Sequence, residues 1–261
     1  MLLWVMRIIA GEFRRRLLET PRDADTTRPI PDRVKESVFM LLRGHCEGAS
    51  VFDAFAGTGA IGLEAVSRGA TRCVMVERDR DVAEILRRNV EALGCADRCE
   101  VVCGDALGAG ALARCPRPCT LAFMDPPYPL VREGLGFRRV MDQLSKLVEC
   151  LTPEGFAVLR TPWPLLLGAG EEEPAPEPVR RRGKHRKERR VRWDEPERPT
   201  RPARVELPED DAIERGDERP TGERPGGKPV FETPSLLLPN AAGPETHEYG
   251  TMAVHLYAKR R

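Results

Sequence analysis

The sequence lacks two features that would place it in a membrane. No apolar run is long enough to span a bilayer, and the apolar segment 1–5 is too short to act as a signal peptide. It also lacks a charge imbalance, because 32% of its residues are charged while the net charge is only +1. Any surface that binds a polyanion must therefore be a local patch. We expect a cytoplasmic protein with no membrane segment.

No C-x-x-C pair and no internal repeat occur in the chain, although it contains eight cysteines. Cys95, Cys99 and Cys103 are spaced four apart, but Cys103 lies in a predicted strand, which makes shared ligation of one ion unfavourable. The sequence therefore predicts reduced cytosolic thiols and no metal site.

Composition changes sharply near residue 169. Residues 171–240 hold 12 of the 24 prolines together with dense runs of both charge signs, which leaves little apolar surface to offset the entropy of ordering. We interpret 169–242 as a disordered, proline- and charge-rich insertion. The alternation returns near Tyr249, so 243–261 is predicted to be a C-terminal strand that completes the sheet of the first domain.

Before the insertion, apolar runs alternate with amphipathic stretches. The predicted strands include Val51–Asp53, Cys73–Glu77 and Gly155–Arg160, with helical periodicity between them. This pattern predicts an α/β fold with a doubly wound, mostly parallel sheet. We expect one domain over 6–168, divided into an N-terminal extension, 6–45, and a core, 50–168.

The N-terminal extension combines a small β-hairpin with a helix. The predicted hairpin, between Arg7 and Leu18, carries several basic side chains. They either prevent an exposed edge strand from pairing with another chain or form an arm that contacts phosphates. A helix opens near Asp32, which can cap it, and its first residues are basic although the helix dipole disfavours positive charge there.

A strand that ends in Asp125-Pro126-Pro127-Tyr128 is the most informative stretch. An acid at the carboxyl end of a buried strand presents acceptors to the ligand crevice of an open sheet. The prolines stiffen the backbone, and the Tyr128 ring can stack on a flat base. The combination suits a planar substrate with an exocyclic amino group. The alternative is a proline-rich turn with an N-cap acid.

A glycine-rich turn over 57–62 follows the first core strand. Its glycines allow a ligand to approach the backbone closely, just before a helix N-terminus. Glu77 ends the next strand, where an acid can accept hydrogen bonds from both hydroxyls of a ribose. The alternative is that Glu77 is a surface acid paired with Arg78 or Arg80. Asp105 can accept from an adenine amine or cap the next turn.

These motifs, in this order, resemble S-adenosylmethionine-dependent amino-methyltransferases. The start, with Met6 to Arg14 and then Arg28-Pro29 before Asp32 to Phe39, resembles the RsmD-type bacterial 16S rRNA guanine-N2 methyltransferases. The resemblance covers about residues 6–160 and the terminal strand. It implies a Rossmann-like class I fold, S-adenosylmethionine as the methyl donor, and 16S rRNA or the small ribosomal subunit as partner. We expect the protein to be a monomer.

The resemblance also implies residue roles. Catalysis would involve Asp125, Pro126 and Tyr128. The residues expected to bind the methyl donor are Asp53, Phe55, Gly57, Thr58, Gly59, Glu77, Asp105 and Ala106. The residues expected to contact RNA are Arg7, Arg14, Arg15, Arg28 and Arg33.

The chain departs from the family pattern in three places. Arg160 and Thr161 stand where such chains usually continue into acidic residues, the insertion is unusual, and residues 1–5 precede the usual start, which makes Met6 a candidate initiator. Two other functions remain open: methylation of adenine N6 or a protein amide by the same chemistry, and nicotinamide-dependent dehydrogenation, since Gly57, Gly59 and Gly62 also match G-x-G-x-x-G.

Overall fold

The computed structural model describes residues 6–21, 30–168 and 231–260. Arg28 and residues 169–230 of the predicted insertion lie outside these residues, so what was predicted for them stays a prediction. Over the part of the chain that is described, no helix is both long enough and apolar enough to cross a bilayer.

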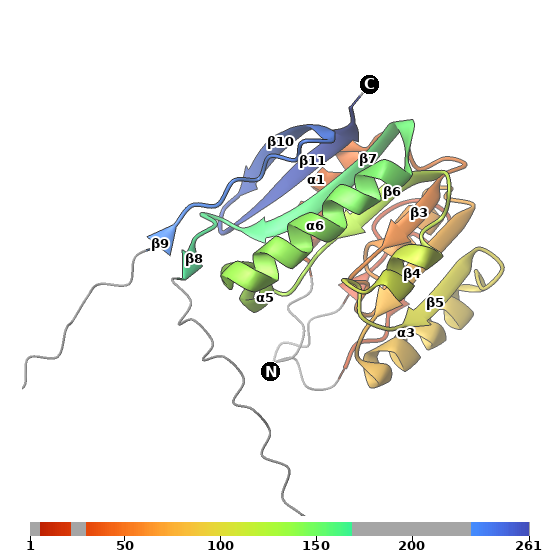
Figure 1. The fold of residues 1–261 in the computed structure, drawn as a ribbon. Helices are drawn as coiled ribbons and strands as arrows, with labels where there is room; N and C mark the ends of the chain where they lie inside the picture. Colours follow the sequence, from red (N-terminus) through yellow and green to blue (C-terminus); the bar gives the residue numbers. More distant parts are fainter. Residues whose placement is uncertain (1–5, 22–29, 169–230, 261) are drawn as a thin grey trace, which may run out of the picture. The chain divides into compact units, whose positions relative to one another are not determined.

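A seven-stranded sheet organises the described chain (Figure 1). Its central pairs are parallel, and its last two strands are antiparallel to their neighbours. From one edge to the other the strands are β10 (Ala241–Tyr249), β11 (Met252–Lys259), β7 (Leu151–Pro162), β6 (Cys119–Met124), β3 (Ser50–Asp53), β4 (Arg72–Glu77) and β5 (Cys99–Cys103). The predicted doubly wound, mostly parallel sheet is confirmed.

Helices cover both faces of the sheet, as the alternation of elements predicts. One face packs against α1 (Asp32–Leu41), α2 (Gly62–Ser67) and α3 (Arg80–Leu93). The other packs against α4 (Ala109–Arg114), α5 (Tyr128–Arg132) and α6 (Gly134–Cys150), and Figure 1 shows α6 lying along β7 and β6. A short pair of strands, β8 (Leu167–Gly168) and β9 (Phe231–Glu232), lies outside the large sheet.

Successive residues of each central strand feed the two opposite cores. On β3, Val51 packs with α1, α2 and α3, whereas the next residue, Phe52, packs on the α6 side; both are fully buried. Because side chains alternate across a strand, a strand buried on both faces is apolar throughout. The continuous apolar runs in the sequence therefore mark the centre of the sheet, and the polar residues that end them mark its rim.

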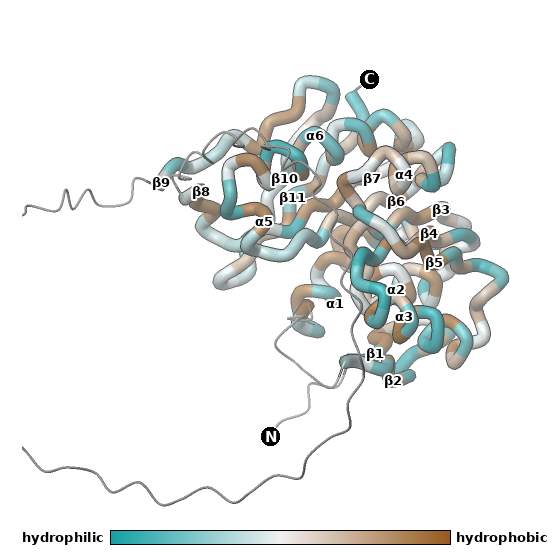
Figure 2. Tube along the Cα trace, turned by 60° about the horizontal axis from the view of Figure 1, so that its bottom comes forward, coloured by the Kyte–Doolittle hydropathy of each residue, from teal (hydrophilic) through white to brown (hydrophobic). Residues whose placement is uncertain are grey.

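The N-terminal extension is a small β-hairpin docked on α2. Its strands β1 (Met6–Arg7) and β2 (Leu17–Leu18) pair antiparallel, and Figure 2 shows them beside α2 and α3. Gly11 adopts φ +84° and lies so close to Ser67 that a Cβ atom would come within 1.7 Å of the Ser67 carbonyl oxygen. Ser67 Oγ in turn accepts from the Phe13 amide at 2.9 Å. The predicted hairpin is confirmed, and its turn requires glycine.

A buried ion pair anchors this extension. Glu64 on α2 is fully buried and accepts the Ile9 amide at 2.7 Å and the Ala10 amide at 3.0 Å. Lys35 on α1 is 1% exposed, lies 3.4 Å from Glu64 and donates to the Arg7 carbonyl at 2.6 Å. Burial lowers the pKa of Lys35, and the Glu64 charge opposes that effect. The positive charge that seemed misplaced at the start of α1 therefore has a structural partner.

The predicted capping role of Asp32 is wrong. Pro31 occupies the N-cap position of α1, no side chain caps the helix, and Asp32 is its first residue. The Asp32 carboxylate accepts from Arg7 at 2.9 Å instead. The long-range ion pair to β1 thus takes the place of the local cap.

The C-terminal segment forms two strands where the sequence analysis expected one. Tyr249 ends β10 and pairs with Met252, which opens β11, so the chain reverses through Gly250 and Thr251. Gly250 has φ +63°, a conformation that tight hairpin turns need and that glycine adopts without strain. The alternation of apolar residues runs through this turn, which is why the sequence looks like one strand. β11 then pairs antiparallel with β7 and extends the sheet.

His255, on β11, predicts a pH-dependent loss of stability. The ring is fully buried between Thr161 Oγ1 and Thr246 Oγ1, each 2.9 Å from a ring nitrogen, and burial lowers its pKa to about 4. An unfolded chain binds that proton more readily, so stability is complete above pH 6.5 and falls as the pH drops from 6.5 to 4. We expect the fall to reach up to about 3 kcal/mol, measured by urea unfolding.

The control for this prediction is His247, a partly exposed histidine on β10 whose Nε2 donates to Glu245 Oε1 at 2.9 Å. His255→Gln is expected to flatten the stability profile between pH 4 and 6.5, and His247→Gln to leave it unchanged. An unaltered profile in His255→Gln would show that other groups dominate the acid response.

Candidate active site

The candidate site lies where the strand order reverses. β3 is flanked by β4 on one side and β6 on the other, so the loops after β3 and β6 leave the sheet in opposite directions. A crevice outside the carboxyl ends of such strands is the ligand site of open α/β sheets. The glycine-rich turn and the Asp125 segment, which the sequence analysis singled out separately, meet at this point.

The glycine turn after β3 presents bare backbone. Gly57 has φ +55°, and a Cβ atom there would meet nothing within 4 Å, so the backbone is open to a ligand. Gly59 serves packing instead, since a Cβ atom would lie 2.5 Å from a Leu86 methyl carbon. The Ala56 amide donates to the Val76 carbonyl at 2.9 Å and holds the turn against β4. Gly57 therefore leaves room for a ligand, whereas Gly59 allows the turn to pack closely against α3.

Asp53 is a fully buried acid at the end of β3. Its Oδ2 accepts the Gly62 amide at 2.9 Å, while Oδ1 is the one buried side-chain oxygen or nitrogen in the described chain without a hydrogen-bond partner. Burial raises its pKa to about 7, with a smaller contribution in the same direction from the charges of Asp125 and Glu77, while the backbone amides of Gly62 and Phe55 act to lower it. An orphaned acceptor of this kind is costly unless a ligand supplies a donor.

Glu77, at the end of β4, faces the glycine turn. Its Oε2 accepts the Gly57 amide at 2.9 Å and its Oε1 accepts the Asp79 amide at 2.7 Å. The structure describes no ion pair from Glu77 to Arg78 or Arg80, the alternative raised by the sequence. Each carboxylate oxygen retains acceptor capacity, so ribose binding by Glu77 stays a prediction consistent with its position.

Asp105 and Ala106 follow β5 on the same rim. Asp105 Oδ1 accepts the Leu107 amide at 3.0 Å, and Oδ2 lies 3.3 Å from an Arg139 nitrogen, so the turn-capping alternative is realised. The buried Ala106 has its carbonyl held by Gln143 at 2.8 Å. Contact of either residue with a methyl donor remains a prediction.

Thr58 and Phe55 have mainly structural contacts. The Thr58 hydroxyl points to Met6 Sδ at 3.4 Å, and its carbonyl accepts from Asn89 at 3.0 Å, which ties the glycine turn to the hairpin and α3. Phe55 is partly buried against the α6-side core. Their predicted contact with a ligand is untested by the structure.

Asp125 is joined to a residue that the sequence analysis did not assign to the site. Arg160 Nε lies 2.5 Å from Asp125 Oδ1, and Arg160 Nη2 lies 2.9 Å from Oδ2. Both side chains are nearly buried, at 12% and 13% exposure. Burial raises the pKa of Asp125, and the Arg160 charge and hydrogen bonds oppose that rise. The signal available in the sequence was the departure from an acidic pattern at Arg160.

Tyr128 and Pro126 complete this corner. Tyr128 opens α5, and its ring centroid lies 5.4 Å from the Arg160 guanidinium carbon and 5.9 Å from that of Arg132. Pro126 is buried. The rings of Pro126 and Pro127 fix the backbone φ angles of the segment that follows β6. The structure thus brings together all three residues predicted to take part in catalysis.

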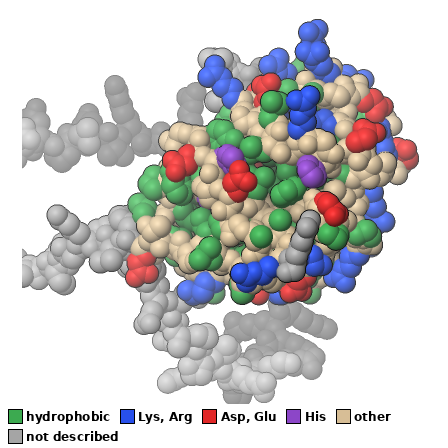
Figure 3. All heavy atoms as spheres, turned by 90° about the horizontal axis from the view of Figure 1, so that it is seen from above, with side chains coloured by type: hydrophobic (Ala, Val, Ile, Leu, Met, Phe, Trp, Pro, Cys, Tyr) green, Lys and Arg blue, Asp and Glu red, His purple; other side chains and the backbone are tan. Residues whose placement is uncertain are grey.

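The arginines predicted to contact RNA lie on the N-terminal extension. Arg7 pairs with Asp32, and Arg14, Arg15 and Arg33 are exposed, while Arg28 falls outside the described residues. The face seen from above in Figure 3 intersperses acidic and basic side chains without a field of one sign. RNA contact by these arginines stays a prediction.

The described cysteines are all free thiols, and no cluster of metal-ligating side chains occurs among the residues that were described. Cys95 Sγ and Cys99 Sγ are 3.7 Å apart, and Cys103 is exposed elsewhere on the β5 edge. The structure thus offers no candidate metal centre in these segments, and the predicted absence of a metal stays a prediction.

The sheet order and the placement of the site define the class I methyltransferase fold. Across 98% of both chains, the structure is similar to the solved "Putative methyltransferase yhhF from Escherichia coli", with a TM-score of 0.58 and 25% identity. The solved "putative methylase HI0767 from Haemophilus influenzae" shows the same fold with a TM-score of 0.55 and 22% identity. The fold class inferred from the sequence is confirmed.

The chain belongs to the family described as "Conserved hypothetical protein 95", whose model matches residues 6–166. It is 40% identical over 130 residues to "Ribosomal RNA small subunit methyltransferase D" of Escherichia coli (strain K12), a match covering 50% of this chain and 62% of that protein. It is 36% identical to "Putative rRNA methyltransferase YlbH" of Bacillus subtilis (strain 168), covering 47% and 67%. The resemblance to the RsmD family is thereby confirmed. The match spans less than two thirds of the Escherichia coli relative.

Proposed function

We propose that this protein transfers a methyl group from S-adenosylmethionine to the exocyclic N2 amine of a guanine in small-subunit ribosomal RNA. The observation that carries the proposal is the Asp125-Pro126-Pro127-Tyr128 segment at the end of β6, placed beside the open glycine turn at the switch point of the sheet. The names of the relatives support the choice of RNA as substrate.

The residues after β3 and β4 suit the methyl donor, which supplies a methyl group activated on a cationic sulfonium sulfur. Its ammonium group would satisfy the orphaned Oδ1 of Asp53. Its ribose hydroxyls would reach Glu77, and the bare backbone at Gly57 would leave room for the chain between them. Asp105 and Ala106 would border the adenine. The site therefore offers buried hydrogen-bond acceptors where S-adenosylmethionine carries hydrogen-bond donors. The residues present fit this methyl donor.

Asp125 and Pro126 would act on the amine that is methylated. The lone pair of a guanine amine is delocalised into the ring, so it is a poor nucleophile. Hydrogen bonds from the amine to the Asp125 carboxylate and the Pro126 carbonyl would localise that pair and orient it. Asp125 is the candidate that takes the proton, directly or through water. Tyr128 would stack on the base after it leaves its helix or when it is single-stranded.

The remaining features of the proposal concern the partner. The exposed arginines of the N-terminal extension would contact RNA phosphates near the site, because affinity for RNA depends on such contacts. We infer a monomer that works in the cytoplasm on 16S rRNA or the small ribosomal subunit.

Transfer of labelled methyl groups tests the substrate class. The protein would be incubated with methyl-labelled S-adenosylmethionine and, in parallel, undermethylated small ribosomal subunits, naked rRNA and duplex DNA. The proposal predicts label in ribosomal RNA only. Label in DNA would favour the adenine-N6 alternative, and label in neither, with donor still bound, would point to protein amides. Consumption of a reduced nicotinamide cofactor would favour the dehydrogenase alternative.

Asp53 predicts that affinity for the methyl donor depends on pH. Because the pKa of Asp53 is about 7 without ligand and an ammonium partner favours the charged form, binding should strengthen as the pH rises through 7. We expect the dissociation constant of S-adenosylmethionine to fall about tenfold between pH 6 and pH 8, measured by calorimetry.

The matched controls for this prediction change either the ligand or the side chain. 5′-Methylthioadenosine lacks the amino-acid part and should bind with no such pH dependence, and Asp53→Asn should abolish the dependence for S-adenosylmethionine. If the unaltered protein binds S-adenosylmethionine with an affinity that does not depend on pH, Asp53 does not bind the ammonium group.

A further inference from the structure

The contact between Asp125 and Arg160 is built into the sheet. β6 and β7 are parallel neighbours in which Met124 is paired with Leu159, so Asp125, which directly follows β6, lies beside Arg160 of β7. The guanidinium then meets the carboxylate through two nitrogens, Nε and Nη2, at 2.5 and 2.9 Å. Two-point contact of this kind fixes the plane of the carboxylate as well as its position.

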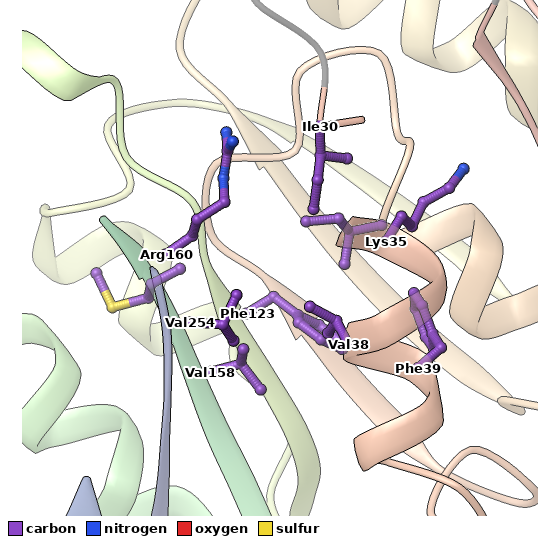
Figure 4. A pocket seen from close by; sticks show the side chains of 10 residues that line it. Ile30, Lys35, Val38, Phe39, Phe123, Val158, Arg160 and Val254 are labelled. Atoms are coloured by element: carbon purple, nitrogen blue, oxygen red, sulfur yellow. The ribbon is translucent and has the colours of Figure 1, made fainter. Parts of the chain in front are cut away.

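The same guanidinium also reaches the stacking residue. Arg160 Nη1 lies 3.5 Å from the Tyr128 hydroxyl and 3.8 Å from Met252 Sδ. Arg160 lines the same apolar cavity as Phe123 and Val254, and Figure 4 shows its guanidinium directed away from these two side chains. With one side chain contacting both Asp125 and Tyr128, the two residues proposed to handle the base are held as a unit.

The two-point contact with Arg160, called the fork below, leaves Asp125 able to accept a further hydrogen bond. Two ionised carboxylate oxygens offer about four acceptor directions, and Arg160 uses one on each oxygen. One direction on each oxygen therefore stays available, in a plane that the fork has set. A substrate amine can bond there without displacing Arg160.

The charge of Arg160 matters because the site is acidic. Asp53, Asp125 and Glu77 lie close enough that the charges of Asp125 and Glu77 raise the pKa of Asp53, and Asp125 itself is nearly buried. In such surroundings a lone buried carboxylate tends to take up a proton and lose its acceptor strength. Arg160 is the cation that opposes this for Asp125.

We propose that Arg160 is a positioning residue of the methyl-transfer site, which holds Asp125 as an ionised, oriented acceptor for the substrate amine. The inference rests on the proposed function and extends it to a residue at which this chain departs from the acidic pattern of the sequences it resembles. Arg160 acts through Asp125 and itself transfers no proton.

Three variants test the proposal in the full chain. Arg160→Gln removes charge and fork, Arg160→Lys keeps charge without the fork, and Arg132→Gln removes the other cation beside Tyr128, which has no contact with Asp125 among those described. For each, kcat would be measured against pH with the RNA substrate, together with the dissociation constant of S-adenosylmethionine.

Arg160→Gln is expected to lower kcat at neutral pH by about tenfold to a hundredfold and to move the acidic limb of the pH profile upward by about one pH unit or more. Arg160→Lys should return the acidic limb to its position in the unaltered protein but should recover only part of kcat. Arg132→Gln should leave the limb in place, and donor affinity should stay within about twofold in all three. An unmoved limb in Arg160→Gln would overturn the proposal, and a raised kcat would show that Arg160 blocks the site instead.

A measurement without RNA separates failure of this inference from failure of the proposed function. The carboxyl carbon of Asp125, assigned by its absence in Asp125→Ala, would be titrated by ¹³C NMR in the unaltered protein and in Arg160→Gln. A higher pKa in Arg160→Gln supports the inference even when no RNA is methylated. Equal pKa values would overturn it even when RNA is methylated.

Discussion

Asp125→Ala is expected to lower methyl transfer to RNA by about a thousandfold while binding of S-adenosylmethionine changes little. The carboxylate is the acceptor that would both orient the amine and receive its proton, and Arg160 cannot replace it because a guanidinium only donates hydrogen bonds. The residues proposed to bind the methyl donor, at the ends of β3 and β4, are untouched. Single-turnover transfer of labelled methyl groups measures the loss.

The control acid for this experiment is Asp142, an exposed residue of α6 that pairs with Lys146. Asp142→Ala should transfer methyl groups at the unaltered rate. Near-ultraviolet circular dichroism of Asp125→Ala would show that the fold persists although Arg160 has lost its partner. Retention of more than a tenth of the activity in Asp125→Ala would contradict its role as the acceptor.

Glu64→Gln is expected to destabilise the protein by about 3–5 kcal/mol, the largest effect on stability that we predict. Glu64 accepts two amides of the N-terminal hairpin and pairs with Lys35 and Arg68, with no exposure to solvent. An amide in its place offers one acceptor oxygen and leaves the buried Lys35 charge without its partner. Urea unfolding measures the loss, and proteolysis within 6–21 should accelerate as the hairpin detaches.

Two further variants show whether burial of charge causes that effect. Glu84→Gln breaks an exposed pair with Arg87 and should change stability by less than about 1 kcal/mol. The double variant Glu64→Gln with Lys35→Met removes both buried charges and should recover part of the loss. A change below about 1 kcal/mol in Glu64→Gln alone would contradict the anchoring role.

The sequence predicted those parts of the site that are encoded locally. The turn at Gly57 and the Asp125 segment could be recognised because glycine, proline and an acid after an apolar run have direct consequences for backbone and chemistry. Their neighbourhood was not predicted; it follows from the parallel pairing of β3 with β6, whose carboxyl ends lie at one rim of the sheet.

The contacts that were missed join residues far apart in the chain. Asp125 and Arg160 are separated by 35 positions, and only the register of β6 with β7 makes them neighbours. Glu64 likewise meets the hairpin amides of Ile9 and Ala10 through tertiary packing. Buried ion pairs of this sort leave no periodic pattern, because each partner taken alone is a surface-like charged residue.

The most direct test of the account identifies the methylated nucleoside. Small-subunit RNA labelled by the protein from methyl-labelled S-adenosylmethionine would be digested to nucleosides and separated by chromatography. The account predicts label in N2-methylguanosine, absent with Asp125→Ala. Label in N6-methyladenosine would preserve the chemistry of Asp125 and contradict the assignment of guanine, and RNA without label would contradict the proposed activity.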